Sequence, residues 1–234
     1  MTRLTEVDIK ALRKIDTPTI CNLVEMIDPG RQSYGYTFRH LHCVFPTMQP
    51  IVGYAKTATI RARVPVARSP EESTAFRERY LDYVGDGTEP KISIVQDLDE
   101  QPGYGALWGE VSTNVHKALG VKGAVTNGSV RDLDMVAKDF QLLAGLIAPS
   151  RAHVHYCDFA CEVNVHGMTV NDGDLIHADR HGAVVIPHRA VHEIPKVLDL
   201  MNRKERVILD AARSPGCTAE MLKAAHRASA KITV

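Results

Sequence analysis

The residues best suited to chemistry are the neighbours Arg131 and Asp132. An arginine presents a planar fork of donors that suits a carboxylate or an enolate oxygen. An aspartate offers hard oxygen ligands for Mg²⁺ or Mn²⁺, ions that usually keep several waters beside one or two protein carboxylates. Together they could polarise a 2-oxo group and stabilise the enolate that is left when a carbon–carbon bond breaks.

A second candidate segment begins at Gly109, whose backbone can approach a ligand closely because it lacks a Cβ atom. If a helix begins here, the backbone amides of Glu110, Val111 and Ser112 are free at its N-terminus. Free amides and the positive end of the helix dipole favour an anion such as a carboxylate. The Glu110 carboxylate could in addition hold a water of the metal.

A strand–helix–strand unit is expected to bring the two segments together. Residues 92–95 predict a short buried strand, residues 109–119 a helix, and residues 121–126 the next strand. The two strands should lie parallel with a right-handed crossover. Ligands collect at the carboxyl ends of adjacent strands in open α/β sheets, and the segments at Gly109 and Arg131 both follow such ends.

Each signal also has an ordinary structural explanation. An Arg-Asp pair at a helix start is often a helix cap with a surface ion pair, and a glycine-rich turn such as Gly103-Tyr104-Gly105 is common before a helix. His153, His155 and Cys157 would share one face of a strand, with Cys161 nearby. They could chelate a transition metal, although half-exposed strand histidines are the commoner explanation.

The remaining elements complete an α/β pattern. The expected helices are residues 6–15, preceded by a capping box at Thr5; a helix beginning at Pro18; one beginning after Ser69; a tail from about Arg189, interrupted or bent near Pro195; and a short last helix after Cys217. Alternating patterns predict strands at 52–64, 161–165, 175–177 and 183–186.

Composition favours one ordinary globular domain over residues 1–234, with a core at about 50–187 and a helical tail at about 189–230. The 28 Lys and Arg residues balance 28 Asp and Glu residues, so we expect no nucleic-acid or membrane partner. The N-terminus lacks the apolar stretch of a signal peptide, and no apolar run reaches membrane-spanning length. The five scattered cysteines predict reduced thiols and a cytoplasmic protein.

We also expect a homo-oligomer. The segment 31–50 is aromatic, histidine-bearing and irregular, and a single small core would not cover both this segment and the helical tail.

Two stretches resemble the RraA-like family. Residues 105–134, GALWGEVSTNVHKALGVKGAVTNGSVRDLD, resemble the core of that family, and residues 171–187, NDGDLIHADRHGAVVIP, are similar to the strand–turn–strand signature that closes it. The family includes 4-hydroxy-4-methyl-2-oxoglutarate (4-carboxy-4-hydroxy-2-oxoadipate) aldolases. The resemblance implies a swivelling β/β/α domain like phosphohistidine domains, with helical N- and C-terminal extensions, in trimers or hexamers.

The resemblance also implies a site. Aldolase members carry an acidic residue, twenty intervening positions and then Arg-Asp, and Glu110 and Arg131-Asp132 fall on that spacing. By resemblance, Asp132 would bind Mg²⁺ or Mn²⁺, Arg131 the oxo oxygen of the substrate, and Glu110 a metal-bound water. The amides of Val111 and Ser112 would hold the pyruvyl carboxylate. Glutamate replaces the usual aspartate at position 110, and its longer arm could shift the water or the metal preference.

The function so implied is that of a divalent-metal-dependent lyase. It would cleave a 4-hydroxy-2-oxo acid to pyruvate and a second carbonyl compound, and oxaloacetate decarboxylation would give the same enolate. The alternative, from another class, is an RraA-type protein-binding regulator of a ribonuclease without catalytic activity. Arg131-Asp132 with an acidic residue at 110 favours the enzyme, because a regulator needs no metal carboxylate.

Overall fold

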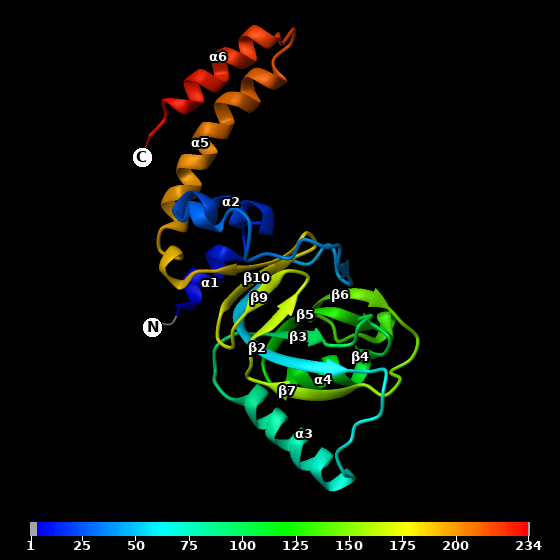
Figure 1. Cartoon of the computed structure of the whole chain (residues 1–234). Coiled ribbons are helices and arrows are strands. Elements are labelled where there is room, and N and C mark those ends of the chain that lie inside the picture. Colours follow the sequence, from blue (N-terminus) through cyan, green and yellow to red (C-terminus); the bar gives the residue numbers. More distant parts are fainter. Residues whose placement is uncertain (1–3, 234) are drawn as a thin grey trace. The chain divides into compact units, whose positions relative to one another are not determined.

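A nine-stranded mixed β-sheet, curled into a half-barrel, forms the centre of the computed structural model (Figure 1). The structure describes residues 4–233. These residues make two compact units, one of residues 4–21 and 33–188 and the other of residues 22–32 and 189–233. The whole sheet belongs to the first unit.

Seven strands follow one another in the order β1-β6-β5-β3-β2-β10-β11, while β4 pairs with β5 and β7 pairs with β2. The strands of the sheet are β1 (His42–Cys43), β2 (Ile51–Arg61), β3 (Lys91–Asp97), β4 (Ala106–Trp108), β5 (Val121–Val130), β6 (Gln141–Ile147), β7 (His155–Phe159), β10 (Leu175–Asp179) and β11 (Gly182–Ile186). A separate hairpin consists of β8 (Val163–Val165) and β9 (Met168–Val170). The neighbours β2, β3, β5 and β6 run parallel, which confirms the predicted parallel pairing of the strands at 92–95 and 121–126.

Two of the helices begin at caps that the sequence predicted, whereas α5 begins at Ile194 and not at the predicted Arg189. They are α1 (Glu6–Leu12), α2 (Thr17–Ile27), α3 (Pro70–Gly85), α4 (Glu110–Ala118), α5 (Ile194–Arg213) and α6 (Ala219–Ala230). Thr5 and Asp8 form both bonds of a capping box before α1, and Ser69 and Glu72 do the same before α3. Each box satisfies two backbone donors that have no partner within the helix, which fixes where the helix begins.

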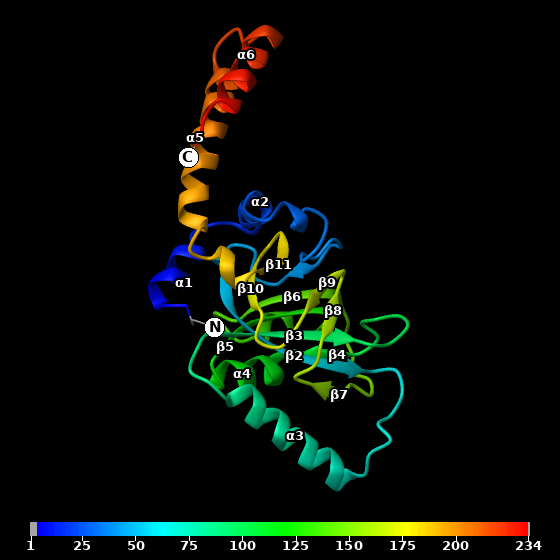
Figure 2. The ribbon, with the colours of Figure 1, turned by 60° about the vertical axis from the view of Figure 1, so that its left-hand side comes forward.

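The two faces of the sheet have different covers. Alternate residues of a strand point to opposite faces, so Ile94, Val125 and Leu143 pack with the β8–β9 hairpin, whereas Val95 and Ala124 pack under α3 and α4. Figure 2 shows α3 and α4 together and the hairpin apart from them. We call the two sides the hairpin-covered face and the helix-covered face.

The start of α2 is tied to β10 by a buried network. The Thr17 amide donates to Asp179 over 3.0 Å, and the Thr17 hydroxyl lies 3.0 Å from Nδ1 of His177. On its other side, the His177 ring binds the carbonyls of Leu12 and Ile15 through Nε2. The first helix therefore ends at Leu12, short of the predicted Ile15, because His177 binds those terminal carbonyls in place of a further helical turn.

Several predicted boundaries were wrong. Strand β5 continues to Val130, so residues 127–129 belong to the strand and do not follow it. Pro195 stands in the first turn of α5 and does not bend it, since a proline at that position needs no amide donor. The strands β1, β4, β6 and β9 were not predicted, and β7 was anticipated only as a strand that would carry His155 and Cys157.

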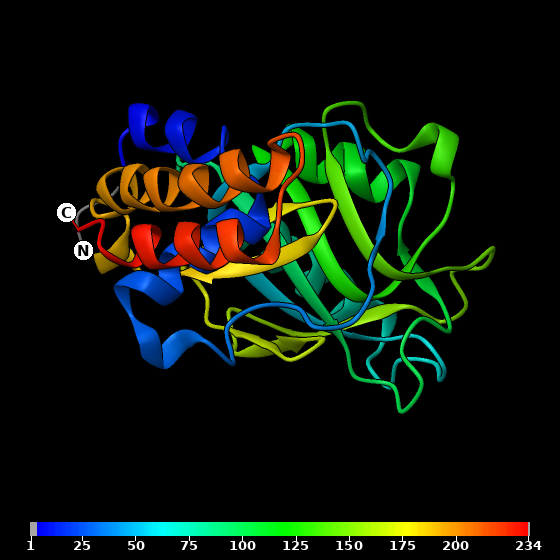
Figure 3. The same ribbon diagram turned by 90° about the horizontal axis from the view of Figure 1, so that it is seen from above.

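In the second unit, α5 and α6 lie side by side (Figure 3). No helix among the described residues is long and apolar enough to cross a membrane. None of the five cysteines, all within the described residues, forms a disulfide. The single domain, the cytoplasmic location and the homo-oligomer stay predictions.

Candidate functional site

The two candidate segments meet because β4 and β5 are parallel neighbours. Trp108 at the end of β4 pairs with Val130 at the end of β5, and the Arg131 amide donates to the Trp108 carbonyl over 2.9 Å. Gly109 and Arg131 therefore leave the sheet side by side at its carboxyl edge. The sequence predicted this meeting but assigned it to the strand at 92–95, whereas the partner of β5 here is the three-residue strand β4.

Gly109 makes room for the carboxylate of Asp132. It stands before α4 with no side-chain cap, and a Cβ atom built on it would lie 2.6 Å from Asp132 Oδ2. The Glu110 amide nitrogen lies 3.4 Å from the same oxygen. The first helical bond of α4 runs from the Thr113 amide to the Gly109 carbonyl, so the amides of residues 110–112 have no partner within the helix.

Asp132 adopts an unusual backbone conformation. Its φ of 53° and ψ of 43° are left-handed, a region that few residues other than glycine, asparagine and aspartate enter. It precedes a 3₁₀ helix at Leu133–Met135 but makes no side-chain cap bond to it. Asp132 thus stands at the N-cap position of this short helix, but its side chain does not cap it. The predicted ion pair is present, with Arg131 Nε 3.6 Å from Asp132 Oδ2 and the carboxylate 28% exposed.

The donor chemistry at this edge fits a hard divalent cation. Asp132 offers carboxylate oxygens to a space that a Cβ at residue 109 would fill. Within residues 4–233 no three His, Cys, Asp or Glu side chains form a metal-binding cluster, and the histidines of the predicted H-x-H pair belong to none. A single carboxylate reached by solvent suits Mg²⁺ or Mn²⁺, because such ions keep several waters.

A cavity of about 650 Å³ adjoins this edge on the helix-covered face, and we call it the arginine cavity. Four of the predicted site residues line it: Gly109, Val111, Ser112 and Arg131. Glu110 and Asp132 stand outside that lining, and the Glu110 side chain is exposed. The other basic or imidazole residues of the lining are Arg68, Arg77, His116, Arg151, His153 and His155. No acidic residue among those described lines the cavity.

The sequence did not single out Arg68 or Arg151. The fold fixes the side chain of Arg68 and the backbone of Arg151. Arg68 donates to the Tyr156 carbonyl and lies 3.9 Å from the centre of the Phe76 ring. The segment of Arg151 passes so close to Gly105 that a Cβ atom on Gly105 would come within 2.4 Å of the Arg151 carbonyl oxygen. The glycine-rich turn Gly103-Tyr104-Gly105 is the feature of the sequence that could have indicated this close contact.

A buried histidine ties α3 to the first turn of α4. His116 Nδ1 lies 2.7 Å from the Ser112 carbonyl, and His116 Nε2 lies 2.9 Å from the Tyr80 hydroxyl. Burial lowers the pKa of His116 to about 4, so the ring is neutral at pH 7. Because a carbonyl only accepts, Nδ1 donates to Ser112 and Nε2 accepts from Tyr80. The amides at the start of α4 are thereby held against α3.

Known proteins resemble this chain in sequence and in fold. The model of the RraA-like family, described as Aldolase/RraA, matches residues 8–185. Protein DlpA of Legionella pneumophila is 26% identical over 159 residues, which are 65% of this chain and 25% of that protein. The chain thus spans about a quarter of the length of that relative.

Two solved structures share the fold. An uncharacterized protein from Pseudomonas syringae pv. tomato has a TM-score of 0.72 and 22% identity, with 97% of this chain and 96% of that chain covered. A Streptomyces coelicolor protein, described as an unusual member of the RNase ES inhibitor RraA protein family, has a TM-score of 0.63 and 21% identity, with 91% and 100% covered. These matches confirm the predicted α/β fold with helices at both ends.

Proposed function

The chain belongs to the RraA-like family, Aldolase/RraA, and from this membership and the site at Gly109, Arg131 and Asp132 we propose that it is a divalent-metal-dependent lyase. The reaction is the cleavage of a 4-hydroxy-2-oxo acid to pyruvate and a second carbonyl compound. Oxaloacetate decarboxylation is a second reaction of the same site. The observation that carries the proposal is the meeting of the α4 amides, Arg131 and Asp132 at one edge of the sheet.

The first turn of α4 and Arg131 bind the substrate. The amides of Val111 and Ser112 receive the pyruvyl carboxylate at the positive end of the helix dipole. The Arg131 guanidinium donates to the oxo oxygen, where negative charge grows as the carbon–carbon bond breaks. The contact therefore strengthens in the transition state, which accelerates the reaction.

Asp132 would hold the metal through its carboxylate, and Arg131 fixes one of its oxygens. When bound, Mg²⁺ or Mn²⁺ supplies a Lewis acid that polarises the oxo group. The exposed Glu110 carboxylate would hold a water of the bound metal, and the Glu110 backbone amide contacts Asp132. A general base takes the proton of the C4 hydroxyl, the C3–C4 bond breaks, and its electron pair stays on C3 of the pyruvate enolate. Protonation at C3 then gives pyruvate.

The arginine cavity supports an acidic substrate. Its lining holds Arg131, Arg68, Arg77 and Arg151 and no carboxylate among the described residues. Such a lining favours ligands with negative charge beyond the pyruvyl carboxylate, because each arginine can pair with a carboxylate through two donors.

The test is pyruvate release from a panel of 4-hydroxy-2-oxo acids and from oxaloacetate, with Mg²⁺, with Mn²⁺ and with excess chelator. We expect pyruvate from at least one acid, abolished by the chelator and restored by either metal. The alternative is a regulator of a ribonuclease, and the Streptomyces relative is described in those terms. No pyruvate from any acid, together with inhibition of a purified ribonuclease by the chain, would establish that alternative instead.

A further inference from the structure

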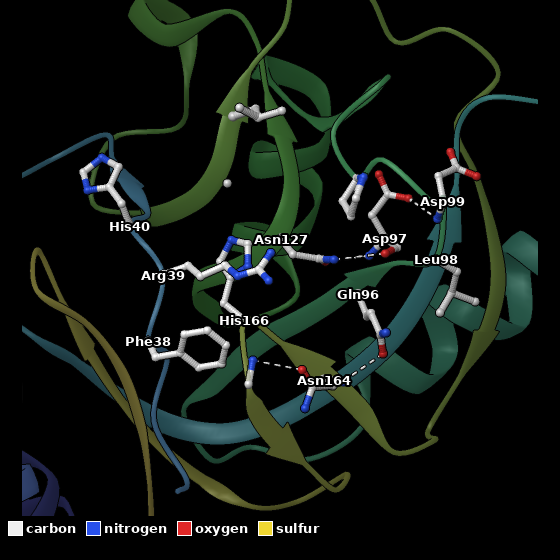
Figure 4. A pocket seen from close by; sticks show the side chains of 14 residues that line it. Phe38, Arg39, His40, Gln96, Asp97, Leu98, Asp99, Asn127, Asn164 and His166 are labelled. Atoms are coloured by element: carbon white, nitrogen blue, oxygen red, sulfur yellow. Dashed lines mark hydrogen bonds between the residues drawn. The ribbon is translucent and has the colours of Figure 1, made fainter. Parts of the chain in front are cut away.

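A second cavity, of about 750 Å³, opens on the hairpin-covered face (Figure 4). We call it the hairpin-side cavity. Its polar lining includes Arg39, Gln96, Asn127, Asn164 and His166. None of the residues proposed for the lyase reaction lines it, so any ligand here binds at a separate place.

The cavity forms where three neighbouring strands stop contributing apolar side chains to the core. Ile94, Val125 and Leu143 are partners across β3, β5 and β6 and belong to the hydrophobic core of the hairpin-covered face. Two residues further along each strand, the same face carries Gln96, Asn127 and Gly145. Since side chains two apart share a face, the hydrophobic core ends there, and polar side chains follow at the carboxyl edge. We call these side chains, Gln96 and Asn127, the polar wall. Ligands collect at such edges of parallel strands.

Internal hydrogen bonds fix the polar wall. The Asn127 amide group accepts from the Asp97 backbone amide over 2.7 Å and donates to the Asp97 carbonyl over 3.0 Å. Gln96 accepts from the Asn164 backbone over 2.8 Å, as Figure 4 shows. The Asp97 carboxylate accepts from the amides of Asp99 and Gly103. The cavity is therefore built in advance, and the Asp97 carboxylate is engaged by its own backbone neighbours.

Two groups in the cavity lack such partners. Figure 4 shows the Arg39 side chain extending toward His166 and Asn127. Within residues 4–233 its guanidinium makes no hydrogen bond or ion pair and lies 5.6 Å from the Phe38 ring centre. His166 Nε2 is buried without a hydrogen-bond partner, and the His166 backbone is left-handed, with a φ of 49°. Burial and the Arg39 guanidinium lower the pKa of His166.

We infer that the hairpin-side cavity binds a small metabolite through an anionic oxygen group, a carboxylate or a phosphate, held by Arg39 and His166. An arginine is well suited to either group, and a neutral histidine adds one hydrogen bond. The volume suits a small molecule. Buried polar groups without partners are rare in native proteins, and His166 Nε2 is such a group. Arg39 is exposed, and its guanidinium has no partner within residues 4–233 that would compete with an anion. The inference does not depend on the lyase proposal.

The test follows the histidine Cε1–H signals of the full chain, labelled with ¹³C at histidine, by NMR. Inorganic phosphate and succinate are titrated separately, and His166→Asn assigns the signal because asparagine tolerates a left-handed backbone. We expect the His166 signal to move with at least one anion. A response to succinate alone identifies a carboxylate ligand, and a response to phosphate alone identifies a phosphate.

The matched variants are Arg39→Gln and Arg79→Gln, which remove the same charge. Arg79 is exposed on α3 and lines neither cavity. Arg39→Gln should weaken the titration about 10- to 100-fold, the loss of one charge-assisted hydrogen bond, and Arg79→Gln should leave it within about twofold of wild type. A His166 signal that never moves, or that moves equally in Arg39→Gln, overturns the inference. So does movement confined to His153 and His155 of the arginine cavity.

Discussion

The arginine cavity and the hairpin-side cavity lie at the carboxyl edge of the same parallel strands but on opposite faces of the sheet. On the helix-covered face, the lining holds Arg77 of α3, Arg68 just before α3, Arg131 and Arg151, and no acidic side chain of the described residues lines the space. On the hairpin-covered face, Asp97 and Asp99 join the lining beside Arg39. The residues that cover each face thus decide which ligand each cavity can hold.

Charge compensation is the main difference. The lining of the first cavity holds four arginines and no carboxylate of the described residues, although Arg131 pairs with Asp132 beyond the lining, and this excess of positive charge favours a ligand with several negative charges. In the second cavity, backbone amides engage the carboxylates of Asp97 and Asp99, and Asp99 also pairs with Arg61. The lining then offers the Arg39 guanidinium and the imidazoles of His40 and His166. That balance favours a single anionic group. The comparison predicts that variants on one face leave the other unaffected.

Arg131→Lys should give the largest effect that is confined to one face of the sheet. Lysine keeps the charge but loses the planar fork, so we expect kcat for pyruvate release to fall by about 10²–10³, or roughly 3–4 kcal/mol, with little change in KM. Steady-state kinetics with melting curves provide the measurement. The His166 titration should be unchanged. Kinetics within about threefold of wild type would show that Arg131 only forms a surface ion pair and takes no part in the reaction.

Gly109→Ala should come next. The added Cβ would lie 2.6 Å from Asp132 Oδ2, so the carboxylate must move. We expect about 10- to 100-fold weaker Mn²⁺ binding by electron paramagnetic resonance, as for other losses of support around a metal ligand. The matched control is Gly30→Ala, where the added atom meets only an ordinary contact at 3.4 Å. Equal Mn²⁺ affinity in Gly109→Ala would contradict the account of this space.

Tyr80→Phe tests the tie between α3 and α4. The substitution leaves Nε2 of the buried His116 without its donor, which should cost about 1–3 kcal/mol of unfolding free energy. KM should rise with it, because Ser112 is held through the same imidazole. Denaturant unfolding and kinetics check both effects. A fully stable variant with an unchanged KM would show that this tie does not position the α4 amides.

The smallest effect should come from Arg77→Gln, compared with Arg79→Gln two residues along α3. Only Arg77 lines the arginine cavity, and both side chains are exposed. Solvent weakens such contacts to at most about 1 kcal/mol, so we expect KM for a substrate with two carboxylates to rise about three- to fivefold in Arg77→Gln alone. Equal kinetics in the two variants would remove Arg77 from substrate binding.

Local signals predicted much of the fold and part of the site. The capping boxes at Thr5 and Ser69 placed two helix starts, and the spacing of Glu110 and Arg131-Asp132 placed the site segments. Strand β4 was not predicted because three residues are too few to show an alternating pattern. Strand β6 escaped because its run QLLAGLI is apolar without alternation, which does not distinguish a strand from a buried helix.

The sequence did not predict which residues line the two cavities. Arg68, Arg151 and Arg39 belong to segments without a motif, and only tertiary packing brings them beside Arg131 or His166. The meeting of Gly109 with Arg131 could be predicted because both segments follow strand ends at one edge of a parallel sheet, even though the strand before Gly109 was assigned wrongly. The neighbours of Arg68 could not, since they depend on how a loop and a helix pack on the sheet.

The central claim, that Asp132 holds the metal of a lyase site, is tested most directly by metal titration of pyruvate release in three proteins. These are wild type, Asp132→Asn and Asp134→Asn, the last a neighbouring exposed carboxylate in the same turn. We predict that Asp134→Asn matches wild type. Asp132→Asn should melt normally, because asparagine accepts the left-handed backbone, yet lose turnover by about 10³-fold or more at every metal concentration. Full turnover of Asp132→Asn, or of wild type in excess chelator, would contradict the account.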